Sequence, residues 1–215
     1  MRTLRLNMNQ TKIAVDIFNK LATGYQDKFM DVSMYHASLN TFCNSIKKEK
    51  AEILELACGP GNITKYLLEK RPDFKILGTD LAPNMIALAK INNPTAEFQL
   101  LDCRKIASLN KKSDGIMFGF GMPYLSKDEV FQFINDASNQ LNKNGILYIS
   151  TMEDDNSKSG FKTGSTGDTM YQNFHQADYL TKSLEESEFK IIHLERKEYI
   201  HNEEKTIDLI IIASK

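Results

Sequence analysis

The segment Ala57–Gly61 combines residue types that suit a bound ligand better than they suit folding alone. It reads Ala-Cys-Gly-Pro-Gly and joins an apolar run, residues 51–57, to a helical pattern that begins at Asn62. Small residues at a strand-to-helix turn let a bound molecule approach the backbone closely. The turn is therefore predicted to hold a ligand, with the carboxylate of Glu55 beside it.

Two further carboxylates stand at the ends of the next two apolar runs. Asp80 ends the run 74–80, and Asp102 ends the run 96–102. The carboxyl ends of parallel strands meet at one edge of a sheet, and that edge is where ligands bind. We expect Glu55, Asp80 and Asp102 to line such an edge together, although each of them taken alone has a helix or strand cap as its alternative role.

Two phosphate-binding patterns fit this turn poorly. A dinucleotide fingerprint requires glycines at the positions of Ala57, Gly59 and Asn62, and only Gly59 meets the requirement. Neither the turn nor the segment 159–167 contains the G-x-x-x-x-G-K-[ST] pattern of a P-loop, whose lysine reaches the terminal phosphates. A nicotinamide dehydrogenase and a P-loop enzyme are therefore disfavoured.

The run from Glu55 to Gly61 resembles the first motif of class I, Rossmann-like S-adenosylmethionine-dependent methyltransferases. That family places an acidic residue before a glycine-rich turn, and the resemblance covers about residues 51–150. Ala57 stands where the family has its first glycine, a departure that we expect to be mild. The resemblance implies S-adenosyl-L-methionine as the cofactor and S-adenosyl-L-homocysteine as the product.

The resemblance also implies roles for single residues. The turn would pass the methionine part of the cofactor, and Asp80 would bind the ribose. Glu55 would supply negative charge and order either waters or the ammonium group. Asp102 would accept the amine of the adenine, while the backbone N–H of Cys103 meets a ring nitrogen. The implied cofactor-binding set, including three apolar side chains that flank the cofactor, is Glu55, Ala57, Gly59, Gly61, Asp80, Leu81, Met85, Asp102, Cys103, Phe118 and Gly119.

The methyl acceptor is expected over the end of the fourth strand, near Gly119 and Phe120. Transfer from a sulfonium needs mainly alignment and exclusion of water, and a base only where the acceptor must lose a proton early. Tyr124 and His175 are the candidate catalytic groups, with a structural role as the alternative for His175. A lid or substrate-binding cap is expected from rings whose alternative role is packing onto the sheet: Tyr25, Phe29, Tyr35, His36 and Tyr171.

The elements that must position these residues alternate along the chain. From residue 51 to 151, short apolar runs alternate with helical patterns, which is typical of a parallel sheet covered by helices. Two C-terminal runs, 190–200 and 205–215, flank a short polar turn and predict an antiparallel hairpin. The predicted fold is an α/β three-layer sandwich: a seven-stranded, mostly parallel sheet with a C-terminal antiparallel hairpin, helices on both faces and an N-terminal helical cap.

The predicted domain organisation has two parts in one compact unit. Residues 1–48 carry apolar residues at three- and four-residue steps and are expected to form the helical cap. Residues 49–215 are expected to form the cofactor-binding domain. Within it, residues 152–174 are rich in Gly, Ser and Thr and read as an irregular lid or substrate loop.

Composition limits the partners. The net charge of −1 disfavours a nucleic-acid ligand, because such proteins usually present a basic face. No apolar run reaches the length that spans a membrane, and no signal peptide is apparent. The three cysteines are widely spaced and no histidine pattern suits zinc, so no metal is expected and a reducing, cytoplasmic location is.

These observations predict a methyltransferase that transfers a methyl group to a small-molecule acceptor by in-line displacement. A methyltransferase acting on a protein or RNA, and a non-catalytic module that binds S-adenosylmethionine, are the alternatives. The sequence does not name the acceptor, the methylated atom or the oligomeric state.

Overall fold

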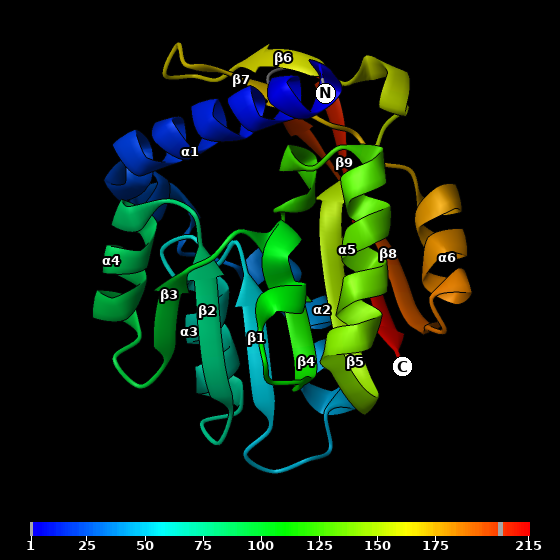
Figure 1. Cartoon of the computed structure of the whole chain (residues 1–215). Coiled ribbons are helices and arrows are strands. Elements are labelled where there is room, and N and C mark those ends of the chain that lie inside the picture. The colour runs from blue at the N-terminus through cyan, green and yellow to red at the C-terminus, as the bar shows by residue number, and fades with distance from the viewer. Residues whose placement is uncertain (1, 202–203) are drawn as a thin grey trace.

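The computed structural model describes the backbone of residues 2–201 and 204–215, and the side chains of residues 10–200 and 205–215. It has three layers, with a central sheet between two layers of helices (Figure 1). The seven strands of the sheet lie in the order β3-β2-β1-β4-β5-β9-β8. Their bounds, in that order, are Glu97–Leu100, Lys75–Asp80, Glu52–Leu56, Ser113–Phe118, Leu141–Met152, Glu204–Ser214 and Lys190–His201.

The first five strands are parallel because helices return the chain to the same edge of the sheet after each strand. β1 pairs with β2 and with β4 in parallel, and β4 pairs with β5 in parallel. All six residues of β4 are buried, as expected for a strand that is covered on both faces. β9 runs antiparallel to both β5 and β8, so the predicted C-terminal hairpin is confirmed. Two residues of its predicted turn, 202 and 203, lie outside the described residues.

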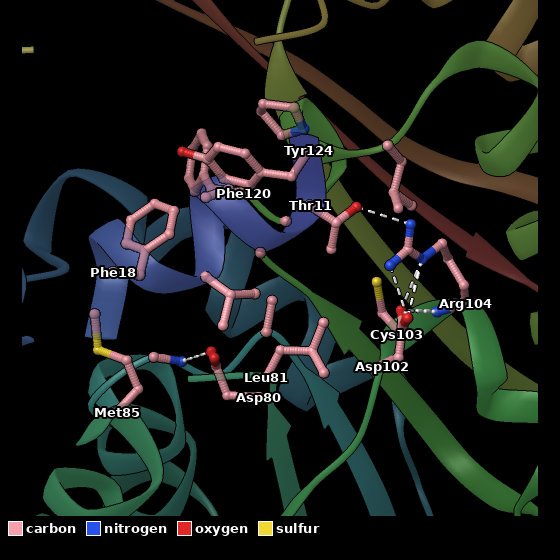
Figure 2. Close-up of a pocket in the computed structure, with 18 of the residues that line it drawn as sticks. Thr11, Phe18, Asp80, Leu81, Met85, Asp102, Cys103, Arg104, Phe120 and Tyr124 are labelled. Carbon is pink, nitrogen blue, oxygen red and sulfur yellow. Dashed lines mark hydrogen bonds and ion pairs between the residues drawn. The ribbon is translucent and has the colours of Figure 1, made fainter. Parts of the chain in front are cut away.

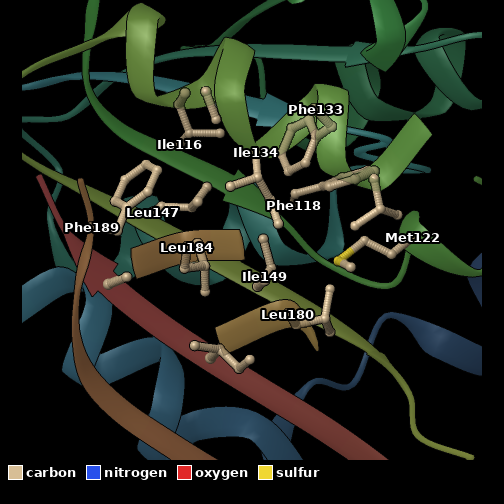
Figure 3. Close-up of a cluster of buried hydrophobic side chains, with 14 of the residues drawn as sticks. Ile116, Phe118, Met122, Phe133, Ile134, Leu147, Ile149, Leu180, Leu184 and Phe189 are labelled. Atoms are coloured by element: carbon tan, nitrogen blue, oxygen red, sulfur yellow. The ribbon is translucent and has the colours of Figure 1, made fainter. Parts of the chain in front are cut away.

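Helices cover both faces of the sheet. Three elements, η2 (Cys103–Ser108), α5 (Lys127–Gln140) and α6 (Ala177–Glu186), bury apolar residues against one face, and Figure 3 shows this cluster. α2 (His36–Ser45) and α3 (Asn62–Lys70) pack on the opposite face. α4 (Pro83–Asn92) packs against the end of the sheet formed by β2 and β3. The predicted three-layer α/β fold is thereby confirmed.

The helix α1 (Arg2–Phe29) lies across the carboxyl edge of the parallel strands. Figure 1 shows it running from the region of β6 and β7 to α4. The side chain and backbone of Asn19 on α1 bond Asn84 at the start of α4, and Lys20 forms an ion pair with Asp168 beside β7. A short turn, η1 (Ser33–Tyr35), then leads into α2. The position of α1 makes it a cover for whatever binds at this edge.

The segment 152–174 differs from the irregular loop that its composition predicts. It contains η4 (Asn156–Lys158) and an antiparallel pair, β6 (Gly160–Thr163) and β7 (Thr169–Gln172). Phe161 and Tyr171 lie opposite each other in this pair and their rings pack edge to face. Each of these strands has only four residues, so the alternation of apolar and polar residues is too short to be recognised in a segment rich in Gly, Ser and Thr. Its predicted role as a lid stays a prediction.

Candidate active site

A pocket of about 290 Å³ opens at the carboxyl edge of the sheet, beneath α1 (Figure 2). The ends of β1, β2 and β4, the segment after β3 and the side chains of α1 all contribute to its wall. Most of the predicted site residues line this one pocket although they come from distant parts of the chain: Tyr25, Phe29, Ala57, Gly59, Asp80, Leu81, Met85, Asp102, Cys103, Gly119 and Tyr124.

The turn after β1 is built from residues in the left-handed backbone region. Ala57, Gly59 and Gly61 have φ values of 50°, 53° and 79°. Only glycine adopts this region without a steric cost, so the alanine at position 57 is a strained replacement and not the mild departure that the sequence suggests. Gly61 lies behind the pocket, where a side chain would meet the Asn93 amide at 2.3 Å. Its glycine therefore serves the packing of α3 against α4.

Glu55 does not line the pocket. Its side chain is 1% exposed and accepts a hydrogen bond of 2.5 Å from the hydroxyl of Thr64 on α3. Burial raises its pKa from 4.5 to about 8, which favours the neutral acid at pH 7. The predicted role of Glu55 as a charged group beside the ligand is contradicted by this placement, because its carboxyl group points toward the helix layer.

Asp80 forms one wall of the pocket at the end of β2. One carboxylate oxygen accepts from the backbone N–H of Gly59 at 2.9 Å, and the other accepts from that of Ala82 at 2.8 Å. Burial raises the pKa of Asp80, while these N–H donors act in the opposite direction. The carboxylate thus braces the glycine turn and still has lone pairs to offer a ligand.

Asp102 is held by a residue that the sequence analysis did not single out. The Arg104 guanidinium pairs with the Asp102 carboxylate at 2.7 Å and reaches Glu129 at 3.1 Å and the Thr11 hydroxyl at 2.9 Å. Burial raises the pKa of Asp102, but the hydrogen bonds from Arg104 outweigh burial and leave that pKa below its usual value. Burial also raises the pKa of the neighbouring Cys103 thiol to about 12, so it stays protonated. The sequence offers one indication of this ion pair, since Arg104 follows Asp102 by only two residues.

Aromatic side chains from α1 and from the loop after β4 form the opposite wall. The Phe18 ring packs edge to face on Tyr124 and on Tyr25, with centroids 5.1 and 5.8 Å apart. Tyr25 in turn contacts Phe29 at 4.6 Å. Figure 2 shows Phe18, Phe120 and Tyr124 across the opening from Asp80 and Leu81. Four α1 residues that the sequence analysis left out of the site also line it, and their helical spacing was the available signal: Thr11, Ala14, Val15 and Phe18.

Two predicted site residues are buried elsewhere. The Phe118 ring packs in the core, 4.7 Å from Phe133, and does not flank a ligand. His175 is fully buried and bonds the Met122 carbonyl at 3.0 Å and the Tyr179 hydroxyl at 2.7 Å. Since a carbonyl only accepts, the ring N–H of His175 donates to it and the other nitrogen accepts from Tyr179. Burial lowers the pKa of His175, and its prediction as a catalytic base is contradicted.

The remaining predicted cap residues also lie outside the main pocket. The Tyr35 hydroxyl donates to the buried Asp208 carboxylate at 2.7 Å, and its ring contacts Phe120. His36 stacks on the buried ring of Tyr66 on α3. Tyr171 borders a small adjoining hollow with Thr11 and Tyr124. The predicted cap therefore divides into pocket residues from α1 and packing residues from the segments that follow.

Over the described part of the chain, no three His, Cys, Asp or Glu side chains gather as metal ligands would. None of the helices within the described ranges combines the length and the apolar character needed to cross a membrane.

Residues 53–145 match the family model described as "Methyltransferase domain". Among curated relatives, a malonyl-[acyl-carrier protein] O-methyltransferase of Acetivibrio thermocellus is 34% identical over 113 residues, which are 48% of this chain and 36% of the relative. A trans-aconitate 2-methyltransferase of Variovorax paradoxus is 33% identical over 101 residues, 47% of this chain and 38% of the relative. The chain thus spans well under half the length of these relatives.

The fold extends the likeness over the whole chain. The solved 1,6-didemethyltoxoflavin-N1-methyltransferase of Burkholderia thailandensis superposes with a TM-score of 0.71 and 17% identity, covering 97% of this chain and 89% of the other. At that identity the superposition shows the fold. It confirms the predicted fold: the chain has the class I, Rossmann-like architecture, and residues 53–145, which include the strands and turns that build the pocket, match a methyltransferase domain.

Proposed function

We propose that this protein is an S-adenosylmethionine-dependent methyltransferase that acts on a small-molecule acceptor. The observation that carries the proposal is the joint presence of Gly59, Asp80 and Asp102 in the wall of one pocket. S-adenosylmethionine is the cofactor of such methyltransferases, and solved proteins of the same fold contain it or its product, S-adenosylhomocysteine. The curated relatives named above act on small acids or their carriers, which supports a small acceptor here.

The hydrogen-bond acceptors in the pocket wall suit this cofactor better than they suit a phosphate ligand. Asp80 and Asp102 present carboxylates, which accept hydrogen bonds from ribose hydroxyls and from an adenine amine but repel phosphates. The side chains of Leu81 and Met85 supply apolar surface beside them. We infer that Asp80 holds the ribose, that Asp102 and the backbone of Cys103 meet the adenine, and that the turn at Gly59 passes the methionine part.

When bound, the cofactor supplies an electrophilic methyl group on sulfur. The chain's own residues then have two tasks: to align the acceptor with that methyl and to exclude water. α1 covers the pocket and its rings close the side away from the sheet. Burial and the neighbouring Tyr25 raise the pKa of Tyr124, so this phenol acts as a hydrogen-bond donor to the acceptor and not as a base.

Calorimetric titration with S-adenosylhomocysteine and with NAD tests the proposal. We expect S-adenosylhomocysteine to bind and to raise the melting temperature, with no effect of NAD. Asp80→Ala should weaken this binding about tenfold or more, because ligand hydroxyls lose their acceptor. Asp136→Ala, a carboxylate on α5 that bonds Gln132 outside the pocket, is the matched control and should bind as the wild type does.

Binding of NAD in place of S-adenosylhomocysteine would overturn the assignment. Unchanged affinity of a folded Asp80→Ala variant would reduce Asp80 to a brace for the glycine turn. If S-adenosylhomocysteine binds and methyl transfer to small molecules is absent while transfer to a protein or RNA is found, the acceptor class would be the part in error.

A further inference from the structure

Phe120 stands at the acceptor end of the pocket in a backbone conformation that bulky residues avoid. Its φ is +54°, in the left-handed region, and it lies between Gly119 and Gly121 directly after β4. A non-glycine residue there costs on the order of 1–3 kcal/mol and persists only where its surroundings hold it. Strained residues of this kind gather at positions that hold a ligand.

Two contacts hold Phe120 in place, and a hydrogen bond anchors one of the partners. Its backbone N–H donates to the Ser150 hydroxyl on β5 at 3.0 Å, and its ring lies 5.1 Å from the ring of Tyr35. Tyr35 is anchored in turn by its hydrogen bond to Asp208, a carboxylate on β9 that is 1% exposed. A ring and a side-chain hydroxyl thus contact Phe120, and a buried carboxyl group anchors that ring. The Phe120 ring that they hold is only partly buried and borders the pocket.

Two more rings complete an aromatic wall around this end. Phe18 and Tyr124 pack edge to face at 5.1 Å, and both are partly exposed to the pocket (Figure 2). An edge-to-face pair next to a third ring leaves flat faces against which a planar molecule can stack or pack edge-on. The Tyr124 hydroxyl adds one donor at the border of this apolar space.

The charges on the pocket wall favour an uncharged occupant. Asp80 and Asp102 both face the pocket, and the guanidinium of Arg104 is already engaged by Asp102 and by Glu129. Carboxylates therefore outnumber the cation among the described charges of the site. Beside S-adenosylhomocysteine, which has no sulfonium charge, an anion brought into this space would be repelled by these carboxylates and would lose its hydration.

On the basis of the function proposed above, we infer that the acceptor is an uncharged, planar aromatic or heteroaromatic small molecule. It packs against Phe120, Phe18 and Tyr124, and one of its polar atoms accepts a hydrogen bond from the Tyr124 hydroxyl. Phe120 is the specificity-determining residue of this site, and Tyr35, Asp208 and Ser150 are its positioning residues. This acceptor differs in charge from the carboxylic acids on which the curated relatives act, as their names state.

Three matched probes test this inference on the full chain saturated with S-adenosylhomocysteine. 4-Hydroxyacetophenone is neutral and planar, 4-hydroxybenzoate has the same ring with a carboxylate, and 1-(4-hydroxycyclohexyl)ethanone has the neutral groups on a saturated ring. Affinities come from titration followed by ligand-observed NMR. We expect the neutral aromatic probe to bind about tenfold more tightly than either of the others, as loss of ring packing or burial of an unpaired charge predicts.

Two variants test whether the probe binds at the aromatic wall formed by Phe18, Phe120 and Tyr124. Phe120→Ala should weaken the neutral aromatic probe about tenfold, and Tyr124→Phe, which keeps the ring, should weaken it about fivefold. The affinity for S-adenosylhomocysteine should stay within about twofold in both variants, because the removed groups are proposed to contact the acceptor and not the cofactor. Phe161→Ala removes a ring on β6 that is 60% exposed and outside the pocket, and it should bind the probe as the wild type does.

The outcomes separate this inference from the function on which it rests. Failure of S-adenosylhomocysteine to bind, which is measured first, overturns the proposed function. With that binding intact, the inference is overturned if no neutral aromatic probe binds, if 4-hydroxybenzoate or the saturated analogue binds equally well or better, or if Phe120→Ala leaves the probe affinity unchanged.

Discussion

At the scale of single residues, the pocket contains two residues in the left-handed backbone region, where any side chain adds a steric cost. Ala57 and Phe120, both non-glycine residues, have positive φ values and border the same pocket. Ala57 is the first residue after β1 and Phe120 is the second residue after β4, so each follows a buried parallel strand. Strain at these two positions is consistent with a site that is held in shape by its surroundings before a ligand arrives.

Ala57→Gly should stabilise the protein. Replacing alanine at a φ of 50° removes a steric cost of about 1 kcal/mol, which exceeds the entropy that glycine adds to the unfolded chain. Urea unfolding measures the change. Ala87→Gly is the matched control: Ala87 is an exposed residue inside α4, where the same substitution should destabilise by about 1 kcal/mol. Equal losses in both variants would contradict the strain at position 57.

At the scale of elements, α1 belongs to the site and not to the main cores. Of the α1 side chains that the structure describes, residues 10–29, none belongs to the two large buried clusters on the faces of the sheet. The buried Ala22 instead joins Ala82 and Met85 in a small cluster at the pocket. Hydrogen bonds from α1 reach α4 and the glycine turn, where the Asn62 amide donates to the Phe29 carbonyl. The described part of α1 is thus attached mainly to elements that border the pocket, and it contributes little to the two large cores.

A chain that begins at Met30 should therefore fold and bind weakly. We expect a cooperative unfolding transition, because the sheet and both large clusters are intact. The affinity for S-adenosylhomocysteine should fall about tenfold or more, since Phe18, Tyr25 and Phe29 no longer cover apolar surface in the pocket. Circular dichroism with urea follows the folding, and calorimetry follows the binding. Loss of cooperative unfolding would show that α1 is part of the core after all.

At the scale of the whole molecule, folding buries a carboxyl group that remains largely neutral. The pKa of Glu55 is about 8 in the folded protein, against 4.5 for an exposed glutamate, because burial disfavours its charged form. Between these two values the folded state holds a proton that the unfolded state has released. The stabilisation from the neutral acid is therefore complete below about pH 4.5 and is lost as the pH rises toward about 8.

Glu55→Gln should flatten this pH dependence, because glutamine does not titrate and its side-chain oxygen still accepts from Thr64. Urea unfolding at a series of pH values should show the free energy of unfolding of the wild type falling, relative to the variant, between about pH 5 and pH 8. Glu69→Gln changes an exposed residue of α3 and serves as the control. Parallel curves for the wild type and Glu55→Gln would contradict the raised pKa.

Much of the fold followed from local pattern. Short apolar runs that alternate with helical periods are enough to predict a parallel sheet, since helices then cover both faces of each strand. The positions of Asp80 and Asp102 at the ends of predicted strands are enough to place both at one edge of the sheet. The resemblance to methyltransferases depends on the same residues, because the turn at 57–61 and the strand ends at Asp80 and Asp102 all lie within residues 51–102.

Side-chain direction and long-range contact required the tertiary structure. In a strand that is apolar on both faces, period two does not reveal which side chains point to the ligand, so Glu55 and Phe118 were assigned to the pocket although they face the helix layers. The pairing of Arg104 with Thr11 and of Phe18 with Tyr124 joins residues about a hundred positions apart, and no local pattern reports such contacts. The sequence by itself thus determined where the ligand edge lies, through the periodicity of its strands. Only the packing of α1 over that edge decided which side chains meet there.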